Sequence, residues 1–315
     1  MAMNRSKKKQ QKKKHPIRNA ILITLGLLLV TGTAFAAFFY QTARVNIDKT
    51  YAPLETSKNQ AEASRAISEN KPLSFLIMGL DSRQEDLSGR TDSLMLVTVN
   101  PTKKQTTMVS IPRDTFIESA DGSITASNKI NAAYVQGGAA ASIAAVNQLL
   151  QLDIDHYVTM NFSGIEHLVD ALGGITVNSD LDFNVDDMTF HKGENTLNGK
   201  KALAYVRMRH DDPRGTYGRE KRQQEVIAAI LSKIKSPQSL TAYQGILEAL
   251  GGNVKTDLTW EQMQKIVLNY NQAFGNVVHE SIQGQGQMLN SLSFQVVAED
   301  EKTRVRNLLQ EQLTQ

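Results

Sequence analysis

The sequence of 315 residues contains no cysteine. This absence excludes a disulfide framework, a zinc site built on thiolates and a catalytic thiol. Two familiar motifs are also missing, the GxxxxGK(S/T) phosphate loop and the GxSxG nucleophile elbow. The six histidines show no HxxxH spacing, so a histidine-based zinc site is not expected. Carboxylates and basic side chains remain as the candidates for chemistry.

Acidic residues are missing from residues 1–40, while eight Lys or Arg precede residue 20. The rest of the chain therefore holds 27 of the 35 basic residues against all 32 acidic ones, a net charge of −5. Residues 20–40 (AILITLGLLLVTGTAFAAFFY) carry no charge, and as a helix they span roughly 30 Å, the thickness of a bilayer core. The basic flank predicts that residues 1–19 are cytoplasmic and residues 41–315 extracellular.

Two alternatives to a membrane anchor arise from the same region. Ala34-Phe35-Ala36 has the form of a signal-peptide cleavage site. The apolar run continues to Tyr40, which favours an uncleaved signal-anchor. The basic tail has the composition of a nucleic-acid segment. Directly before an apolar span, membrane topology and attraction to anionic lipids explain it better, and no nucleic acid is expected as a partner. An exported chain without disulfides suits a Gram-positive cell surface.

The remainder of the chain alternates strand and helix patterns. Residues 41–72 are polar and predict a stalk or a peripheral helix. The continuous apolar run at 73–80 predicts a strand buried on both faces. Further strands are expected at 93–100, 106–111, 156–162, 277–282 and 293–298, and helices at 140–152, 163–174, 219–235, 239–250, after Thr259 and from about 299. This order predicts one α/β domain over 73–315, with a central mixed sheet covered by helices on both faces.

Three short segments place ionisable residues at the ends of predicted strands. They are GLDSR at 79–83, GRTDS at 89–93 and SIPRD at 110–114. Ligands of open α/β sheets bind outside the carboxyl ends of the strands. One such segment alone would be read as an ordinary turn, but three together favour a functional site. The ionisable residues that they supply are Asp81, Arg83, Arg90, Asp92, Arg113 and Asp114.

These residue types limit the ligand. Carboxylates without a nearby histidine suit a hard cation such as Mg²⁺, which usually binds together with phosphate. The guanidinium fork matches phosphate oxygens and stays charged. Phosphate neutralised jointly by Mg²⁺ and arginine is the requirement of phosphoryl transfer.

The most basic stretch outside the tail is YVRMRHDDPRGTYGREKRQQ at 205–224. In a helix over 219–235, Arg219, Arg222 and Gln223 share one face in the first turn, where free backbone N–H groups attract anions. Arg207 and Arg209 approach from the other side of the intervening loop. Residues 202–209 fit a helix or a strand, and we assign no binding role to Arg214.

These segments, in this order behind one N-terminal anchor, resemble the LytR–CpsA–Psr family of bacterial envelope proteins. The match runs from about Leu73 to about Ile234 and also includes NKIN at 128–131, LVDALGGI at 168–175 and ALAYVRMR at 202–209. The resemblance implies a phosphotransferase that moves a glycopolymer from a polyprenyl-pyrophosphate carrier to a peptidoglycan sugar hydroxyl outside the membrane, with Mg²⁺ as cofactor and Mn²⁺ as the alternative.

The resemblance also implies roles for individual residues. Asp81 and Asp92 match the family's acidic pair around the metal, and with Arg113 they are the expected catalytic residues. Which aspartate, if either, acts as general base stays open. The residues that match the family's pyrophosphate-binding positions are Arg83, Arg90, Arg113, Lys129, Arg207, Arg209, Arg219 and Gln223.

Other functions stay open at this point. A pyrophosphatase that uses water as acceptor would need the same residues. A membrane-bound regulator or a polymer-binding scaffold would not need catalysis, although residues 1–19 are too short for a DNA-reading domain. Among polymers, wall teichoic acid is the first expectation and capsule the next.

Overall fold

The structure is a computed structural model that describes residues 50–54, 60–82, 87–209, 211–234, 246 and 251–314. The basic tail, the apolar segment 20–40, Arg83 and most of the helix expected at 239–250 lie outside these residues. Among the residues that the structure describes, no helix has the length and apolar character needed to cross a membrane. All of the described residues belong to one compact unit, Arg44–Gln315.

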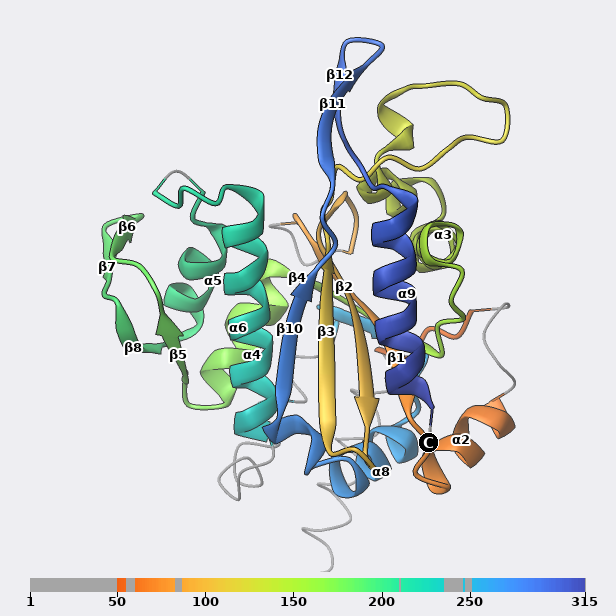
Figure 1. Cartoon of the computed structure of the whole chain (residues 1–315). Helices are drawn as coiled ribbons and strands as arrows, with labels where there is room; N and C mark the ends of the chain where they lie inside the picture. Colours follow the sequence, from red (N-terminus) through yellow and green to blue (C-terminus); the bar gives the residue numbers. More distant parts are fainter. Residues whose placement is uncertain are drawn as a thin grey trace, which may run out of the picture. The chain divides into compact units, whose positions relative to one another are not determined.

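The centre of this unit is a mixed six-stranded sheet with the order β10-β3-β2-β1-β4-β9 (Figure 1). Its strands are β1 (Leu73–Leu80), β2 (Thr91–Asn100), β3 (Gln105–Ile111), β4 (His156–Asn161), β9 (Val254–Thr256) and β10 (Val277–Ser281). β1, β2 and β3 form an antiparallel meander, while β4 is parallel to β1 and β10 is parallel to β3. The strands β1, β3, β4 and β10 therefore end at one edge of the sheet, beside the start of β2.

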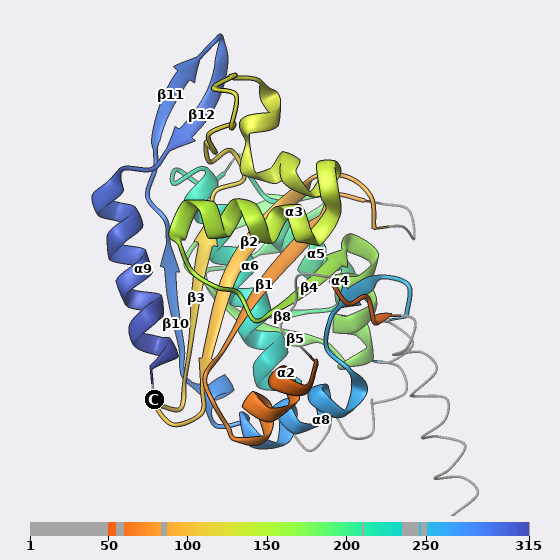
Figure 2. The ribbon, with the colours of Figure 1, turned by 90° about the vertical axis from the view of Figure 1, so that its right-hand side faces the viewer.

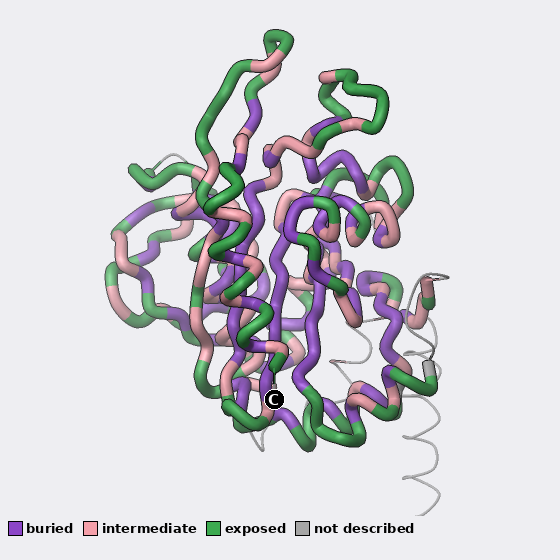
Figure 3. The backbone as a smooth tube through the Cα atoms, turned by 45° about the vertical axis from the view of Figure 1, so that its right-hand side comes forward, coloured by how far each residue is buried: buried purple, intermediate pink, exposed green. Residues whose placement is uncertain are grey.

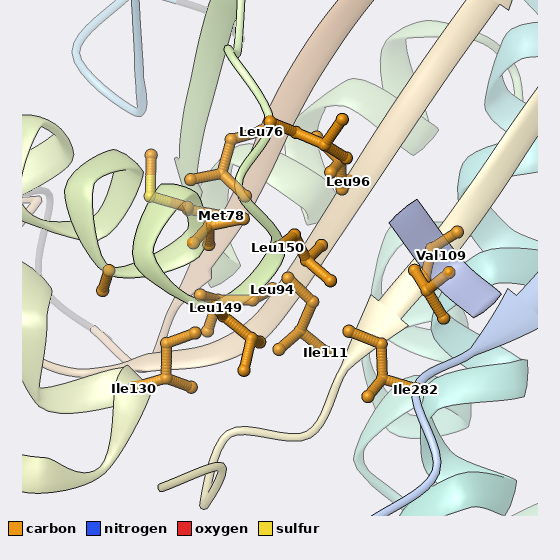
Figure 4. Packing of buried hydrophobic residues seen from close by; sticks show 14 of the residues in the cluster. Leu76, Met78, Leu94, Leu96, Val109, Ile111, Ile130, Leu149, Leu150 and Ile282 are labelled. Carbon is orange, nitrogen blue, oxygen red and sulfur yellow. The ribbon is translucent and has the colours of Figure 1, made fainter. Parts of the chain in front are cut away.

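Helices α3 (Ala133–Leu150) and α9 (Glu299–Leu313) pack on one face of the sheet (Figure 2). Side chains alternate across a strand, so Leu76 and Met78 of β1 point to this face and are fully buried. The same cluster contains Leu94, Leu96, Val109, Ile111, Leu149, Leu150 and Ile282 (Figure 4).

The opposite face packs against α2 (Gln60–Ser68), α6 (Thr216–Ile234) and α8 (Trp260–Asn269). Leu73 and Phe75, the alternate residues of β1, point to this side. Ile67 of α2 is fully buried in this cluster, so α2 belongs to the globular unit, which begins before the predicted boundary at residue 73. The prediction of a central mixed sheet with helices on both faces is confirmed.

A third apolar cluster lies beside the sheet, between α6 and the helices α4 (Phe162–Ala171) and α5 (Gly199–Arg207). Two small hairpins complete it, β5 (Ile175–Ser179) with β8 (Gly193–Leu197) and β6 (Phe183–Val185) with β7 (Met188–Phe190). Its centre is Tyr205 of α5, which is fully buried against Phe183 and Phe190.

A hairpin of β11 (Gln285–Leu289) and β12 (Leu292–Val296) projects beyond the edge where β10 ends (Figure 1). The short helices η1 (Ala126–Asn128) and η2 (Ile130–Ala132) lead into α3, and η4 (Ala273–Gly275) precedes β10. Figure 3 shows the contrast between the buried central strands and the exposed tip of the hairpin.

The structure corrects several local predictions and decides one that the sequence left open. Residues 199–207 form a helix, which decides the question left open for 202–209. Helix α3 begins at Ala133, earlier than predicted, and is kinked at Gly137 and Gly138, where the backbone is not helical. Helix α4 begins at Phe162, one residue before the predicted start, and its N-cap is Asn161, whose side chain accepts from the backbone N–H of Gly164 at 2.8 Å. β11 was not predicted, because its glycine and glutamines lack an apolar alternation.

Candidate active site

Charged side chains follow the strands at the edge where β1, β3 and β4 end. Asp81 comes directly after β1, and Arg113 and Asp114 come after β3. Asp92 lies in the second position of β2, which starts at this edge. The predicted placement of these four residues at strand ends is confirmed.

A β-bulge orients Asp92. Gly79 of β1 pairs with Ser93 and Leu80 pairs with Thr91, so Asp92 has no partner residue on β1. Bulges next to active sites commonly redirect one side chain. The Asp92 side chain is only 15% exposed and contacts two arginines.

Five side chains form a continuous network of alternating charge. Arg113 donates to one Asp92 oxygen at 2.7 Å, and Arg209 donates to the other at 3.3 Å. Arg113 lies 3.6 Å from Asp114, whose other oxygen accepts from Lys129 at 2.7 Å. Three cations and two carboxylates leave this network with an excess of one positive charge.

Arg219 adds a further cation, which is buried. The residue is 5% exposed, and its Nε has no hydrogen-bond partner among the described residues. The pKa of Arg219 is lowered because the side chain is buried and because Arg113 and Arg209 repel its charge; Asp92 and Glu220 act in the opposite direction. A buried charge is costly unless a partner compensates it, so this site is built for an anion that a ligand supplies.

Helix α6 begins at Thr216, before the predicted start at residue 219. The backbone N–H of Arg219 already donates to the Gly215 carbonyl at 3.3 Å, so it is not one of the free N–H groups of the first turn. The prediction of first-turn N–H groups around Arg219 is therefore wrong, and its guanidinium must attract the anion. Gln223 is half-buried one turn later on the same face.

Arg222 was expected beside Arg219, and this expectation is wrong. Arg222 is 2% exposed and forms an ion pair with the buried carboxylate of Asp212. It also donates to the backbone carbonyls of Tyr205 at 3.2 Å and Met208 at 2.7 Å. Arg222 therefore holds the end of α5, from which Arg207 and Arg209 extend.

Arg214 belongs to the loop between α5 and α6 and holds it from the solvent side. Its guanidinium contacts both carboxylate oxygens of Asp212 at 2.9 Å and also forms an ion pair with Asp180. These contacts are structural, in agreement with the absence of an assigned binding role.

Gly218, in the first turn of α6, packs very closely against Asp212 of the loop between α5 and α6. A Cβ atom there would lie 1.9 Å from an Asp212 oxygen. Alanine in place of a helix glycine ordinarily stabilises by about 1 kcal/mol. We expect Gly218→Ala to lower the free energy of unfolding instead, by about 1–3 kcal/mol, measured by urea denaturation. Gly286→Ala is the control, since the nearest atom to its Cβ would be 3.9 Å away, and equal effects of the two changes would contradict this account.

The other predicted residues lie at the margin of the network. Arg207 lies over the ring of Phe162, directly after β4, at 5.2 Å from its centre. Arg90 is exposed, and its carbonyl accepts from the backbone N–H of Asp81 at 3.2 Å. Asp81 is exposed as well, and Arg83 lies outside the described residues.

Glu220 is a residue of this region that the sequence analysis missed. It is 5% exposed, one oxygen accepts from the Ser281 hydroxyl at 2.6 Å, and the other has no hydrogen-bond partner among the described residues. Burial raises the pKa of Glu220 to about 7, although Ser281 and Arg219 act to lower it. Its place beside Arg219 in the sequence was the only available signal.

The carboxylates present are compatible with Mg²⁺. Asp81 and Asp92 come from adjacent strand ends and supply oxygen ligands, as Mg²⁺ requires. Within the described parts of the chain, no group of three or more His, Asp or Glu gathers as a metal site. Two carboxylates suffice for Mg²⁺ only when waters and substrate phosphate complete the coordination. The pair therefore fits a metal that binds together with a phosphate ligand.

The mixed sheet with carboxylates and arginines clustered at its carboxyl edge defines the chain as an α/β protein with a charged site at the strand ends. The chain belongs to the LytR_cpsA_psr family, whose model matches residues 35–311. The predicted family resemblance is confirmed.

Named relatives are similar over nearly the whole chain. The polyisoprenyl-teichoic acid–peptidoglycan teichoic acid transferase TagU of Enterococcus faecalis is 40% identical over 92% of this chain and 96% of its own length. The protein of the same name from Bacillus licheniformis is 36% identical over 96% and 98%. The crystal structure of B. subtilis TagU has a TM-score of 0.62 and 36% identity, covering 78% of this chain and 98% of that one. TagT bound to LI-WTA has a TM-score of 0.64 and 27% identity, covering 78% of this chain and 92% of that one.

Proposed function

We propose that this chain transfers an anionic glycopolymer, wall teichoic acid first of all, from a polyprenyl-pyrophosphate carrier to a sugar hydroxyl of peptidoglycan. The observation that carries the proposal is the buried Arg219, whose Nε has no hydrogen-bond partner within the described part of the chain and whose charge is repelled by Arg113 and Arg209. A pyrophosphate supplies the negative charge that these guanidiniums lack. The names of the relatives support the choice of polymer and acceptor.

The reaction joins the acceptor hydroxyl oxygen to the phosphorus on the sugar side of the pyrophosphate. The bond from that phosphorus to the bridging oxygen breaks, and the lipid phosphate leaves with the electron pair. Arg113, Arg209 and Arg219 stabilise the charge that develops on the phosphate oxygens. Asp92 holds Arg113 and Arg209 toward one another until the pyrophosphate takes its place as their partner.

The proton of the acceptor hydroxyl needs a base. Both oxygens of Asp92 are engaged by arginines, whereas Asp81 is exposed at the end of β1. Asp81 is therefore the better candidate for the general base. Once the pyrophosphate has replaced Asp92 as the partner of Arg113 and Arg209, Asp92 and one oxygen of Asp81 would hold Mg²⁺, which would supply charge neutralisation at the phosphate oxygens.

The proposed topology follows the charge pattern of the N-terminus. Residues 1–19 lie in the cytoplasm, residues 20–40 anchor the chain in the membrane, and the sheet lies outside the cell. This places the site on the side of the membrane where peptidoglycan is found.

A transfer assay tests the proposal. The full chain is incubated with a defined polyprenyl-pyrophosphate-linked polymer, Mg²⁺ and peptidoglycan, and the products are separated by chromatography. Polymer attached to peptidoglycan is the expected result. Free polymer phosphate in equal amounts with and without peptidoglycan would indicate a pyrophosphatase and contradict the proposal.

Asp81→Asn tests the roles of the carboxylate. We expect the transfer rate to fall about 10²-fold, because the base is lost. We also expect the Mg²⁺ concentration for half-maximal activity to rise about tenfold, because one anionic ligand becomes neutral. Asp182→Asn is the matched control, since that side chain is 74% exposed outside the site. A full rate in Asp81→Asn would exclude both roles.

A further inference from the structure

The two sides of the candidate site differ in charge. The stretch at 205–222 contributes the arginines of one side. Beside them lie residues 281–297 (SIQGQGQMLNSLSFQVV), here called the arm, which contact α6 through Tyr217 and Glu220 and contain no Asp, Glu, Lys, Arg or His. Residues 114–128, which contact the arm, contain three acidic residues and no basic one. All seventeen positions of this projecting element are thus uncharged, although charged residues make up 21% of the chain.

The outer part of the arm, around the turn between β11 and β12, is exposed. Gln285 and Gln287 of β11 are exposed, and Met288 is 67% exposed (Figure 3). Within the described residues the strand β11 pairs only with β12, so its outer edge is open. Proteins usually protect such an edge with lysine, proline or an inward-pointing charge, and the arm has none of these. An unprotected edge of this kind suits a surface that another molecule covers.

The arm is attached directly to the site. Tyr217 of α6 exchanges hydrogen bonds with the backbone of Gly284, with the Tyr217 oxygen 3.0 Å from the Gly284 nitrogen. On the other strand, the backbone N–H of Gln295 donates to the Asp114 carbonyl and its carbonyl accepts from Phe116, each at 2.9 Å.

The base of the arm also meets the charge network. Lys129, which pairs with Asp114, lies over the ring of Phe294 at 5.8 Å from its centre. Phe116 packs edge-on against the same ring at 5.2 Å. A molecule bound along the arm is therefore guided toward Arg113 and Asp114.

The charge distribution decides which substrate fits the arm. A polyanion is attracted by lysine and arginine, which the arm and residues 114–128 lack. The glycan backbone of peptidoglycan consists of N-acetylated sugars, whose hydroxyl and amide groups form hydrogen bonds with glutamine amides and strand-edge backbone groups. The exposed Met288 offers apolar contact for a sugar ring.

We propose that the arm binds the uncharged glycan backbone of the acceptor and directs one of its hydroxyl groups to the site. The inference rests on the proposed function, because it assigns the donor polymer to the arginine side and the acceptor to the arm. Two other molecules could occupy the arm instead: a polyanionic donor, or a second copy of this chain paired along the β11 edge.

The test compares two double variants of the full chain. Gln287→Ala/Met288→Ala removes exposed side chains of the arm. Gln264→Ala/Leu268→Ala makes equivalent changes on α8, at the other end of the sheet, where Leu268 is 71% exposed (Figure 1). Binding of a chitin oligosaccharide, which has the same kind of backbone without stem peptides, is measured by isothermal titration calorimetry without donor. Transfer kinetics are measured in parallel.

We expect the arm variant to weaken oligosaccharide binding about tenfold, for the loss of one hydrogen bond and one apolar contact. The KM for peptidoglycan should rise similarly, while kcat and the KM for the donor stay unchanged, and the α8 variant should behave as wild type. Unchanged acceptor binding, an altered donor KM, or a dimer that the arm variant converts to monomer would each overturn the inference. Arm-dependent oligosaccharide binding without any transfer would instead support the arm and reject the proposed function.

Discussion

Arg219→Met is expected to stabilise the chain and nearly abolish its activity. The wild-type guanidinium is buried, its Nε finds no hydrogen-bond partner among the residues that the structure describes, and Arg113 and Arg209 repel its charge. Replacing such a charge with an apolar side chain of similar length should raise the free energy of unfolding by about 1–2 kcal/mol. The same change removes a donor from the developing phosphate charge, so transfer should fall about 10²–10³-fold. Binding of inorganic pyrophosphate should weaken as well.

Arg222→Met is the matched control on the same helix. Arg222 is also buried, but it pairs with Asp212 and donates to the carbonyls of Tyr205 and Met208. Its removal leaves a buried carboxylate and two carbonyl groups without this donor. We expect the free energy of unfolding to fall by about 3–5 kcal/mol. The two arginines are three residues apart, yet their replacement should change stability in opposite directions.

Urea denaturation and calorimetry with pyrophosphate measure these effects. The comparison is made at pH 6, where Glu220 is mostly protonated and does not lose a needed counter-ion when Arg219 is replaced. A loss of stability in Arg219→Met as large as that in Arg222→Met would show that Arg219 serves the fold. Full pyrophosphate binding by Arg219→Met would remove it from the site.

The sequence was sufficient to predict five of the six strands of the sheet and the positions of the site loops, but not the short edge strand β9. The run at 73–80 is apolar at nearly every position, which only a strand buried on both faces requires, and it is β1 without change of bounds. Charged residues directly after such strands must lie at the sheet edge, so Asp81, Arg113 and Asp114 were placed correctly.

The sequence did not predict which partner each charged side chain has in the folded protein. Helical periodicity put Arg219 and Arg222 on one face, but periodicity does not identify what packs against that face. Asp212 reaches Arg222 only because the intervening loop folds back onto α6. The bulge at Asp92 depends on a register shift between two strands, and no residue type in GRTDS signals it.

Glu220 gives the chain a dependence of stability on pH that a single substitution should remove. Its carboxyl is buried, and one oxygen lacks a hydrogen-bond partner among the described residues, so the neutral form is favoured in the folded state. The pKa of Glu220 is raised from 4.5 to about 7. Below pH 4.5 the carboxyl is protonated whether the chain is folded or unfolded, and its contribution to stability is fully present.

Between pH 4.5 and about pH 7 the folded state binds more protons than the unfolded state, so the free energy of unfolding must fall as pH rises. The shift corresponds to a loss of about 3 kcal/mol by pH 8. Glu220→Gln keeps the hydrogen bond to Ser281 without the charge, so its stability relative to wild type should grow by about 2.5 kcal/mol between pH 5 and pH 8. Urea denaturation at a series of pH values measures the difference, with the exposed Glu261→Gln of α8 as control. Parallel curves for wild type and Glu220→Gln would mean that Glu220 is charged and paired in the folded protein, in which case it would act as the counter-ion of Arg219 rather than as a neutral neighbour.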